Sequence, residues 1–131
     1  MNKELISTEN RVRKLNEILK NLETISGIIG TCLVKTNGLL ITSRLPRDLD
    51  HRKIGAMSAT MFGAMENASS ALGSDEKLNS LTIELDEYQL MVIEVGEDII
   101  FASLIDLNVN LGLILIEIEE TIKKIKNMAN L

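Results

Sequence analysis

One stretch constrains the fold more than any other, a long helix that the apolar spacing predicts over residues 48–73. Its large apolar residues recur in steps of three or four, at Ile54, Met57, Met61, Met65, Ala68 and Leu72. That spacing places them in one stripe along an amphipathic helix of about six turns. Asp48 or Asp50 would cap the start of the helix, and Gly73 would end it. We expect the stripe to face the core of the chain.

Another flank of the same helix carries a row of small residues. Gly55, Ala59 and Gly63 recur every four residues. Small side chains at this spacing let a second backbone approach closely, which helps to fix how two helices cross. Each glycine costs a helix interior about 1 kcal/mol relative to alanine, so a compensating contact is expected. Two alternatives stay open, a tight contact within the chain and a partner helix.

The rest of the chain predicts two more helices and five strands. Helical stripes cover residues 7–25 and 111–125, and residues 1–7 form an irregular start. Strands are predicted at 28–35, 39–44, 78–85, 88–95 and 99–105, with an Asn37-Gly38 turn in the first hairpin. Apolar runs such as 28–35 and 99–105 suit strands covered on both faces. The fold class is therefore α/β: a single domain over 1–131, with one five-stranded antiparallel sheet sandwiched by helices.

The strand predicted at 78–85 differs from the others because one of its sides is polar. Its odd-numbered positions are apolar and its even-numbered ones polar, Leu81, Ile83 and Leu85 against Ser80, Thr82 and Glu84. This alternation favours an edge position, or a part of the sheet that is less covered.

Composition excludes several classes of protein. The formal net charge is −5 and aromatic residues make up 2% of the chain, which argues against nucleic-acid binding. No apolar run reaches the ~18–20 residues that cross a bilayer, and no signal peptide is recognisable. The single cysteine, Cys32, excludes an internal disulfide framework. We expect a cytoplasmic protein without membrane insertion.

No residue pattern indicates catalysis, a cofactor or a metal. His51 follows Asp50, but no motif places a nucleophile near this pair, and we interpret His51 as an exposed residue of the first helical turn. One cysteine and one histidine cannot make a structural zinc site. No glycine-rich phosphate loop is present. We therefore expect no enzyme activity, no cofactor and no metal.

Basic residues surround the entry to the central helix, at Arg44, Arg47, Arg52 and Lys53. A solvated loop is the simpler interpretation. The alternative is a docking patch for an acidic surface of a partner.

Three segments in order resemble a known family. They are SGIIGTCLVKTNGLLITSRLP at 26–46, the small-residue helix ending in ALG at 71–73, and GEDIIFASLIDLNVNLG at 96–112. Together they resemble the Roadblock (dynein light chain Roadblock-type) domain family over nearly the whole chain, and its short prokaryotic members in particular. The resemblance implies a profilin- or longin-like fold that forms homodimers or pairs with a Roadblock paralogue. Many relatives regulate or scaffold small Ras-like GTPases, and others tether cargo to dynein.

The resemblance also implies where the contacts lie. A dimer interface on the central helix and edge strand would use Gly55, Ala59, Gly63, Leu78, Ser80, Thr82 and Glu84. Partner-binding candidates on the exposed side of the paired helices are Arg52, Lys53, Phe62, Met65 and Glu66. Phe62 lies off the methionine stripe and is a plausible anchor there. Its alternative role is packing within the dimer interface.

The leading hypothesis is a dimeric, non-catalytic regulator or scaffold of a small Ras-like GTPase. If it accelerates GTP hydrolysis, it either inserts an arginine (Arg44, Arg47 or Arg52) or orders the switch loops of the GTPase, and we favour the second mechanism. The alternative is a structural adaptor dimer with no effect on nucleotide chemistry. A small-molecule sensor would need a roomy pocket with convergent polar groups, which the sequence does not indicate.

Overall fold

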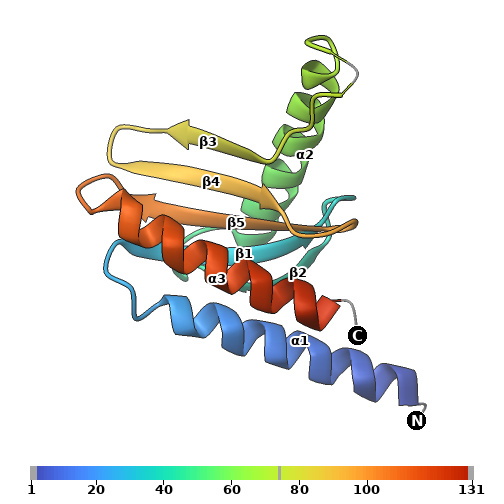
Figure 1. Ribbon diagram of the computed structural model, residues 1–131. Helices are drawn as coiled ribbons and strands as arrows, with labels where there is room; N and C mark the ends of the chain where they lie inside the picture. Colours follow the sequence, from blue (N-terminus) through green and yellow to red (C-terminus); the bar gives the residue numbers. More distant parts are fainter. Residues whose placement is uncertain (1–2, 74, 130–131) are drawn as a thin grey trace.

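The computed structural model describes the backbone of residues 3–73 and 75–129, and the side chains of 8–73 and 75–128. Three helices and five strands follow one another (Figure 1): α1 Lys3–Leu22, β1 Ile28–Lys35, β2 Leu40–Arg44, α2 His51–Ser69, β3 Ser80–Glu84, β4 Tyr88–Glu94, β5 Ile99–Asp106 and α3 Leu111–Ala129. The predicted α/β class and element order are confirmed.

The five strands form one sheet in the order β2-β1-β5-β4-β3, and every neighbouring pair is antiparallel. β3 is therefore an edge strand, as its alternating pattern predicted. β2 forms the other edge. β1 of the first hairpin pairs with β5 of the three-stranded meander β3–β4–β5. Since β2 and β3 lie at opposite edges, α2, which connects them in the chain, has to cross the sheet.

Most predicted boundaries lie within two residues of the observed ones, and the exceptions concern the helices. α1 begins at Lys3, so the irregular start expected for 1–7 is wrong for the backbone from Lys3 onward. The Asp50 carboxylate accepts a hydrogen bond from Lys53 N at 3.1 Å, which makes Asp50 the cap of α2. α2 ends at Ser69, before the predicted Gly73, and its last turn continues as turns through Leu72.

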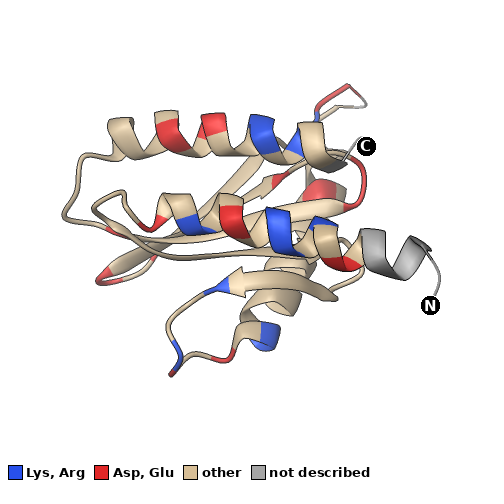
Figure 2. Cartoon of the chain, turned by 90° about the horizontal axis from the view of Figure 1, so that it is seen from below, with Lys and Arg blue, Asp and Glu red and all other residues tan. Residues whose placement is uncertain are grey.

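One face of the sheet is covered by two helices. α1 and α3 lie side by side and antiparallel on this face (Figures 1 and 2) and contact each other. Their apolar stripes meet the side chains of the inner strands in one cluster, which includes Leu15, Leu19, Phe101, Ile114 and Ile118. Each of these five side chains is buried. Two helices thus close this face.

The other face is covered by α2 alone, and the prediction of its core face is wrong. Its buried residues are Gly55, Ser58, Ala59 and Phe62, whereas Met57 and Met65 are 52% and 44% exposed. The cause is close packing, since a Cβ added at Gly55 would lie 3.2 Å from Leu40 Cδ1. Only small residues fit between α2 and the sheet at that point, so the large apolar side chains point elsewhere.

Candidate protein-interaction site

Side chains on the α2 face of the sheet form rows that cross the strands. One row runs beneath α2 and is fully buried in its centre, with Val92 and Cys32 both at 0% exposure. The next row along the strands comprises Ile83, Leu90 and Leu104, which are directly paired across β3, β4 and β5. All three are only half-buried. The helix therefore covers one part of this face and leaves the adjoining apolar row in partial contact with solvent.

The contacts of α2 show which of its flanks borders the open row. Gly55 lies against Leu40 and Val34, and Gly38 of the first hairpin turn lies near Ala56. Those contacts belong to the side of the helix that faces the β1–β2 turn. Because successive residues turn by about 100° around a helix, Met61 and Met65 lie on the opposite flank, toward the open row, whereas Met57 points more nearly away from the sheet.

We call the resulting surface the open α2 face. It combines the methionine flank of α2, the half-buried row of the sheet and the exposed ends of the β3–β4 hairpin: Met61, Met65, Ile83, Leu85, Leu90, Leu104 and Tyr88. Leu85 and Tyr88 are 52% and 39% exposed, and by strand alternation both belong to this side of the sheet. Exposed apolar surface of this kind is typical of an interaction site.

The predicted dimer residues divide into two groups. Gly55 and Ala59 are used within the chain, so the in-chain alternative holds for them, and Leu78 packs in the cluster beneath α2. A Cβ at Gly63 would meet nothing within 4 Å, and the alternate positions Ser80, Thr82 and Glu84 of the edge strand are exposed. The contact within the chain explains why two of the three small residues are small.

The partner-binding candidates divide in the same way. Arg52, Lys53, Met65 and Glu66 are exposed. Phe62 is 1% exposed, packed between α2 and the sheet, so its prediction as an exposed anchor is wrong. It lies off the methionine stripe because it belongs to the true core face of α2.

Arg44 differs from the other residues of the basic patch because its side chain is bonded within the chain. Its Nε donates to Glu23 Oε1 at 2.5 Å and its Nη2 to Glu23 Oε2 at 3.1 Å, while Nη1 donates to Asn16 Oδ1 at 3.2 Å. The hydrogen bond from Arg44 lowers the pKa of the Glu23 carboxyl below its ordinary value. Arg44 thus fastens α1 to β2, whereas Arg47 and Arg52 are exposed.

His51 is half-buried and not the exposed residue that the sequence predicted. Its Nε2 lies 2.8 Å from the Pro46 carbonyl oxygen, and its Nδ1 lies 2.7 Å from Ser43 Oγ. A carbonyl only accepts, so Nε2 carries the proton and, in the neutral ring, Ser43 donates to Nδ1. A carbonyl stands where a catalytic triad has a carboxylate. The imidazole instead ties the loop before α2 to strand β2.

Comparison with known proteins identifies the fold family. The family model of the Roadblock/LC7 domain matches residues 14–104. The chain belongs to the Roadblock/LC7 domain family. It is 36% identical over 114 residues to the uncharacterized protein MJ0714 of Methanocaldococcus jannaschii, which covers 87% of this chain and 95% of that one. The resemblance proposed from the three sequence segments is confirmed.

Two solved structures show the same fold at low identity. MglB of Myxococcus xanthus superposes with a TM-score of 0.84 at 19% identity, covering 91% of this chain and 90% of that one. An MglB described with a tetrameric arrangement superposes with a TM-score of 0.82 at 15% identity, covering 92% and 90%. These likenesses establish that the arrangement of sheet and helices is that of Roadblock proteins.

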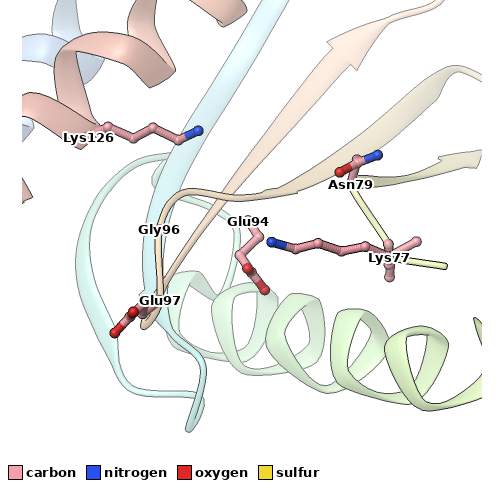
Figure 3. Close-up of a pocket in the computed structure, with 7 residues that line it drawn as sticks. Lys77, Asn79, Glu94, Gly96, Glu97 and Lys126 are labelled. Carbon is pink, nitrogen blue, oxygen red and sulfur yellow. The ribbon is translucent and has the colours of Figure 1, made fainter. Parts of the chain in front are cut away.

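This Roadblock domain also has a charged hollow of about 260 Å³ where β4 ends. Figure 3 shows the Lys77 ammonium pointing toward Glu94 there. Burial raises the pKa of Glu94, as does the neighbouring Glu66, while Lys77 works against the shift. Glu66, a predicted partner-binding residue, is thus beside another carboxyl. Among the described side chains, those of residues 8–73 and 75–128, no three metal-ligating groups gather, here or elsewhere.

A larger groove of about 660 Å³ lies under the first half of the described part of α1, and the sequence did not predict it. Val12, Leu15, Ile41 and Ile99 supply apolar walls, and residues of the two neighbouring turns supply polar ones. The groove forms where several separate elements meet, so no local sequence motif predicts it.

In the described ranges, none of the helices combines the length and apolar character needed to cross a membrane.

Proposed function

We propose that this Roadblock domain forms a dimer through the open α2 face, as a homodimer or with a paralogue, and serves as a non-catalytic regulator or scaffold of a small Ras-like GTPase. The observation that carries the proposal is the half-buried row of Ile83, Leu90 and Leu104 beside the flank of α2 that carries Met61 and Met65. This apolar surface is continuous with the edge strand β3.

Two physical effects favour a second copy as the occupant of this face. Burying apolar side chains stabilises an interface by about 25 cal/mol per Å² removed from water. An edge strand presents main-chain N–H and C=O groups that pair with another strand. A second Roadblock domain supplies both a methionine flank and a β3 edge. Methionine suits such a surface because its flexible side chain adapts to its partner.

Family membership supports the GTPase part of the proposal, since many Roadblock proteins regulate or scaffold such GTPases. The exposed basic group of Arg47, Arg52 and Lys53 is available to an acidic partner surface. Arg44 is held by Glu23, which makes it a poor arginine finger. We therefore propose that the dimer acts by ordering the switch loops of the GTPase.

The proposal includes two broader statements. Residues 1–131 act as one Roadblock-type domain, which is supported by the packing of α3, beyond the matched residues 14–104, in the same core as α1. The protein works in the cytoplasm, in keeping with Cys32 as a buried, unpaired thiol whose pKa is raised to about 12 by burial.

Nucleotide-dependent binding tests the function. The purified chain is titrated against the small Ras-like GTPases of its own organism, each loaded with GDP or with a non-hydrolysable GTP analogue. We expect affinities for the two states of one GTPase to differ by at least about tenfold, because a regulator must distinguish them. Arg47→Ala with Arg52→Ala should weaken binding, while Arg44→Ala serves as the matched arginine control.

Equal affinity for both nucleotide states would favour the adaptor alternative, and no binding at all would contradict the GTPase proposal. A second outcome concerns mechanism. The variant with Arg44, Arg47 and Arg52 all changed to alanine distinguishes the two mechanisms. If it still binds the GTPase but no longer stimulates hydrolysis, the protein acts by inserting an arginine and not by ordering the switch loops.

A further inference from the structure

The outer side of α3 carries charges that are separated along the helix. Three exposed acidic residues precede three exposed basic ones, Glu117, Glu119 and Glu120 before Lys123, Lys124 and Lys126. Figure 2 shows the resulting acidic half and basic half of α3. Two large apolar side chains extend the same outer side toward the start of the helix, Leu113 at 61% and Ile116 at 57% exposure.

The geometry of the helix confirms that these side chains face away from the protein. Ile114, Ile118 and Ile125 are buried against the sheet. At about 100° per residue, Ile116 and Glu120 lie on the opposite side. The neighbouring helix α1 differs, since all its exposed side chains from Thr8 to Leu22 are polar. In this layer, the described apolar side chains that are exposed gather on α3.

We propose that α3 pairs with α3 of a second copy, antiparallel and about a two-fold axis near residues 121–122. In that register Glu120 faces Lys123 of the second copy across the centre. On one flank Glu117 faces Lys124 of the second copy, and on the other Glu119 faces Lys126 of the second copy. Two-fold symmetry repeats each contact, so every one of the six charges meets an opposite charge.

The antiparallel arrangement is selected by the charges themselves. A parallel pair in register would place Glu beside Glu and Lys beside Lys, which is repulsive. One of these pairs also favours the isolated helix, since Glu120 lies 3.7 Å from Lys123 in its own chain. Both residues of that pair are largely exposed and can change partner.

This contact lies on the side of the sheet opposite α2 (Figure 1), so it does not compete with the open α2 face. A protein with both contacts would form dimers of dimers, or a chain of dimers if the two axes do not meet. One helix pair buries less than the ~1,200 Å² typical of stable complexes, so the contact is weak and needs a concentrated protein.

Salt dependence provides the first test. The solution mass of the chain is measured by sedimentation equilibrium up to about 0.5 mM protein, a range suited to a small interface. Between about 50 mM and about 500 mM NaCl, we expect the association constant of the α3 contact to fall by about tenfold, because exposed ion pairs are screened. The open α2 face is apolar, and its pairing should persist at high salt.

Charge exchange provides the second test and does not depend on the first. A variant with all three glutamates changed to lysine and one with all three lysines changed to glutamate should each fail to self-associate through α3. Mixed together, they should associate. A variant carrying all six exchanges should self-associate like the unmodified chain but should not pair with it. Arg13→Glu, Lys14→Glu and Lys20→Glu on α1 form a control with the same change in net charge as the variant whose three lysines are changed to glutamate.

Circular dichroism on each variant verifies that the helices remain. The proposal is overturned if the mass of the unmodified chain is independent of salt at every concentration, or if the two charge-exchanged variants do not associate when mixed. The Met65→Glu variant separates this contact from the proposed function. A chain that no longer pairs through α2 should still show the salt-dependent step.

Discussion

The two faces of the sheet are built on different principles. On one face, two long helices lie side by side, and their aliphatic stripes leave a closed core that includes Leu19 and Ile118 at 0% exposure. On the other, the single helix α2 crosses the strands (Figure 1), with small residues beneath it and methionines along its flank. The first face completes the fold of one chain. The second leaves part of its sheet open.

Dimensions explain the difference. A helix with its side chains is about 10–12 Å wide, and successive residues on one face of a strand are about 6.8 Å apart. A helix that crosses the strands therefore covers about two rows of side chains and not a third. The two covered rows contain Val34 paired with Ile100, and Cys32 and Val92, both paired with Ala102. The third row is that of Ile83, Leu90 and Leu104. An uncovered apolar row is thus a direct consequence of using one transverse helix on a broad sheet.

The largest predicted effects come from truncating a buried side chain on either face. Ile118→Ala should cost about 2–5 kcal/mol and Phe62→Ala about 3–5 kcal/mol of unfolding free energy, because each leaves a cavity. Met65→Ala, at a position 44% exposed, is the matched truncation on α2 and should cost less than about 1 kcal/mol in the monomer. Urea unfolding at fixed, low protein concentration measures all three. A small effect at Phe62 would mean that α2 does not pack as described.

A smaller effect separates the two glycines of α2. Gly63→Ala should stabilise the monomer by up to about 1 kcal/mol, since the new methyl group enters open space and alanine favours the helix. Gly55→Ala gains the same helix propensity, but its new methyl group would press against Leu40. It should therefore stabilise the monomer less than Gly63→Ala does, or destabilise it. Thermal unfolding of the pair measures the difference. Equal stabilisation by both substitutions would show that α2 does not approach the sheet closely.

The smallest effects are those of two carboxyl groups whose pKa values shift in opposite directions. Glu23 has a lowered pKa, so its contribution is present above its usual value of 4.5 and is lost as the pH falls through the lowered value. Glu94 has a raised pKa, so stability is lost as the pH rises through that value. Glu23→Gln should therefore destabilise at neutral pH, by less than about 1 kcal/mol because the pair is exposed.

Glu94→Gln should remove the loss of stability that accompanies ionisation at that position. Unfolding free energies measured from about pH 2 to about pH 7 follow both groups. Parallel pH profiles for Glu23→Gln and Glu94→Gln would contradict the opposite environments of the two carboxyl groups.

The sequence predicted the elements and their order well because these depend on local patterns. Period-two and period-three-to-four spacing located the strands and helices, and the Asn37-Gly38 turn fixed the first hairpin. The alternation of β3 even predicted its edge position. The family followed from three ordered segments, each of them a turn or strand that this fold requires.

The face of α2 was predicted the wrong way round, and the reason is physical. Hydrophobic size alone places Met57 and Met65 inside and Gly55 outside. The distance between helix and sheet reverses that choice, and it is set by contacts with Leu40 and Val34 that no local pattern reveals. The signal that was available is compositional, because flexible methionines are typical of surfaces that meet a partner. The groove under α1 and the Glu66–Glu94 contact depend on tertiary packing in the same way.

The central claim is that the open α2 face is covered by a second copy, and solution mass tests it most directly. Light scattering across a dilution series in high salt should give a mass near twice 14.5 kDa for the unmodified chain. Met65→Glu should give a folded monomer, because a charge cannot be buried unpaired in that interface. Thr60→Glu, an exposed position on the other flank of α2, is the control with the same change in charge. A monomeric mass for the unmodified chain at every concentration, or an undisturbed dimer for Met65→Glu, would contradict the account.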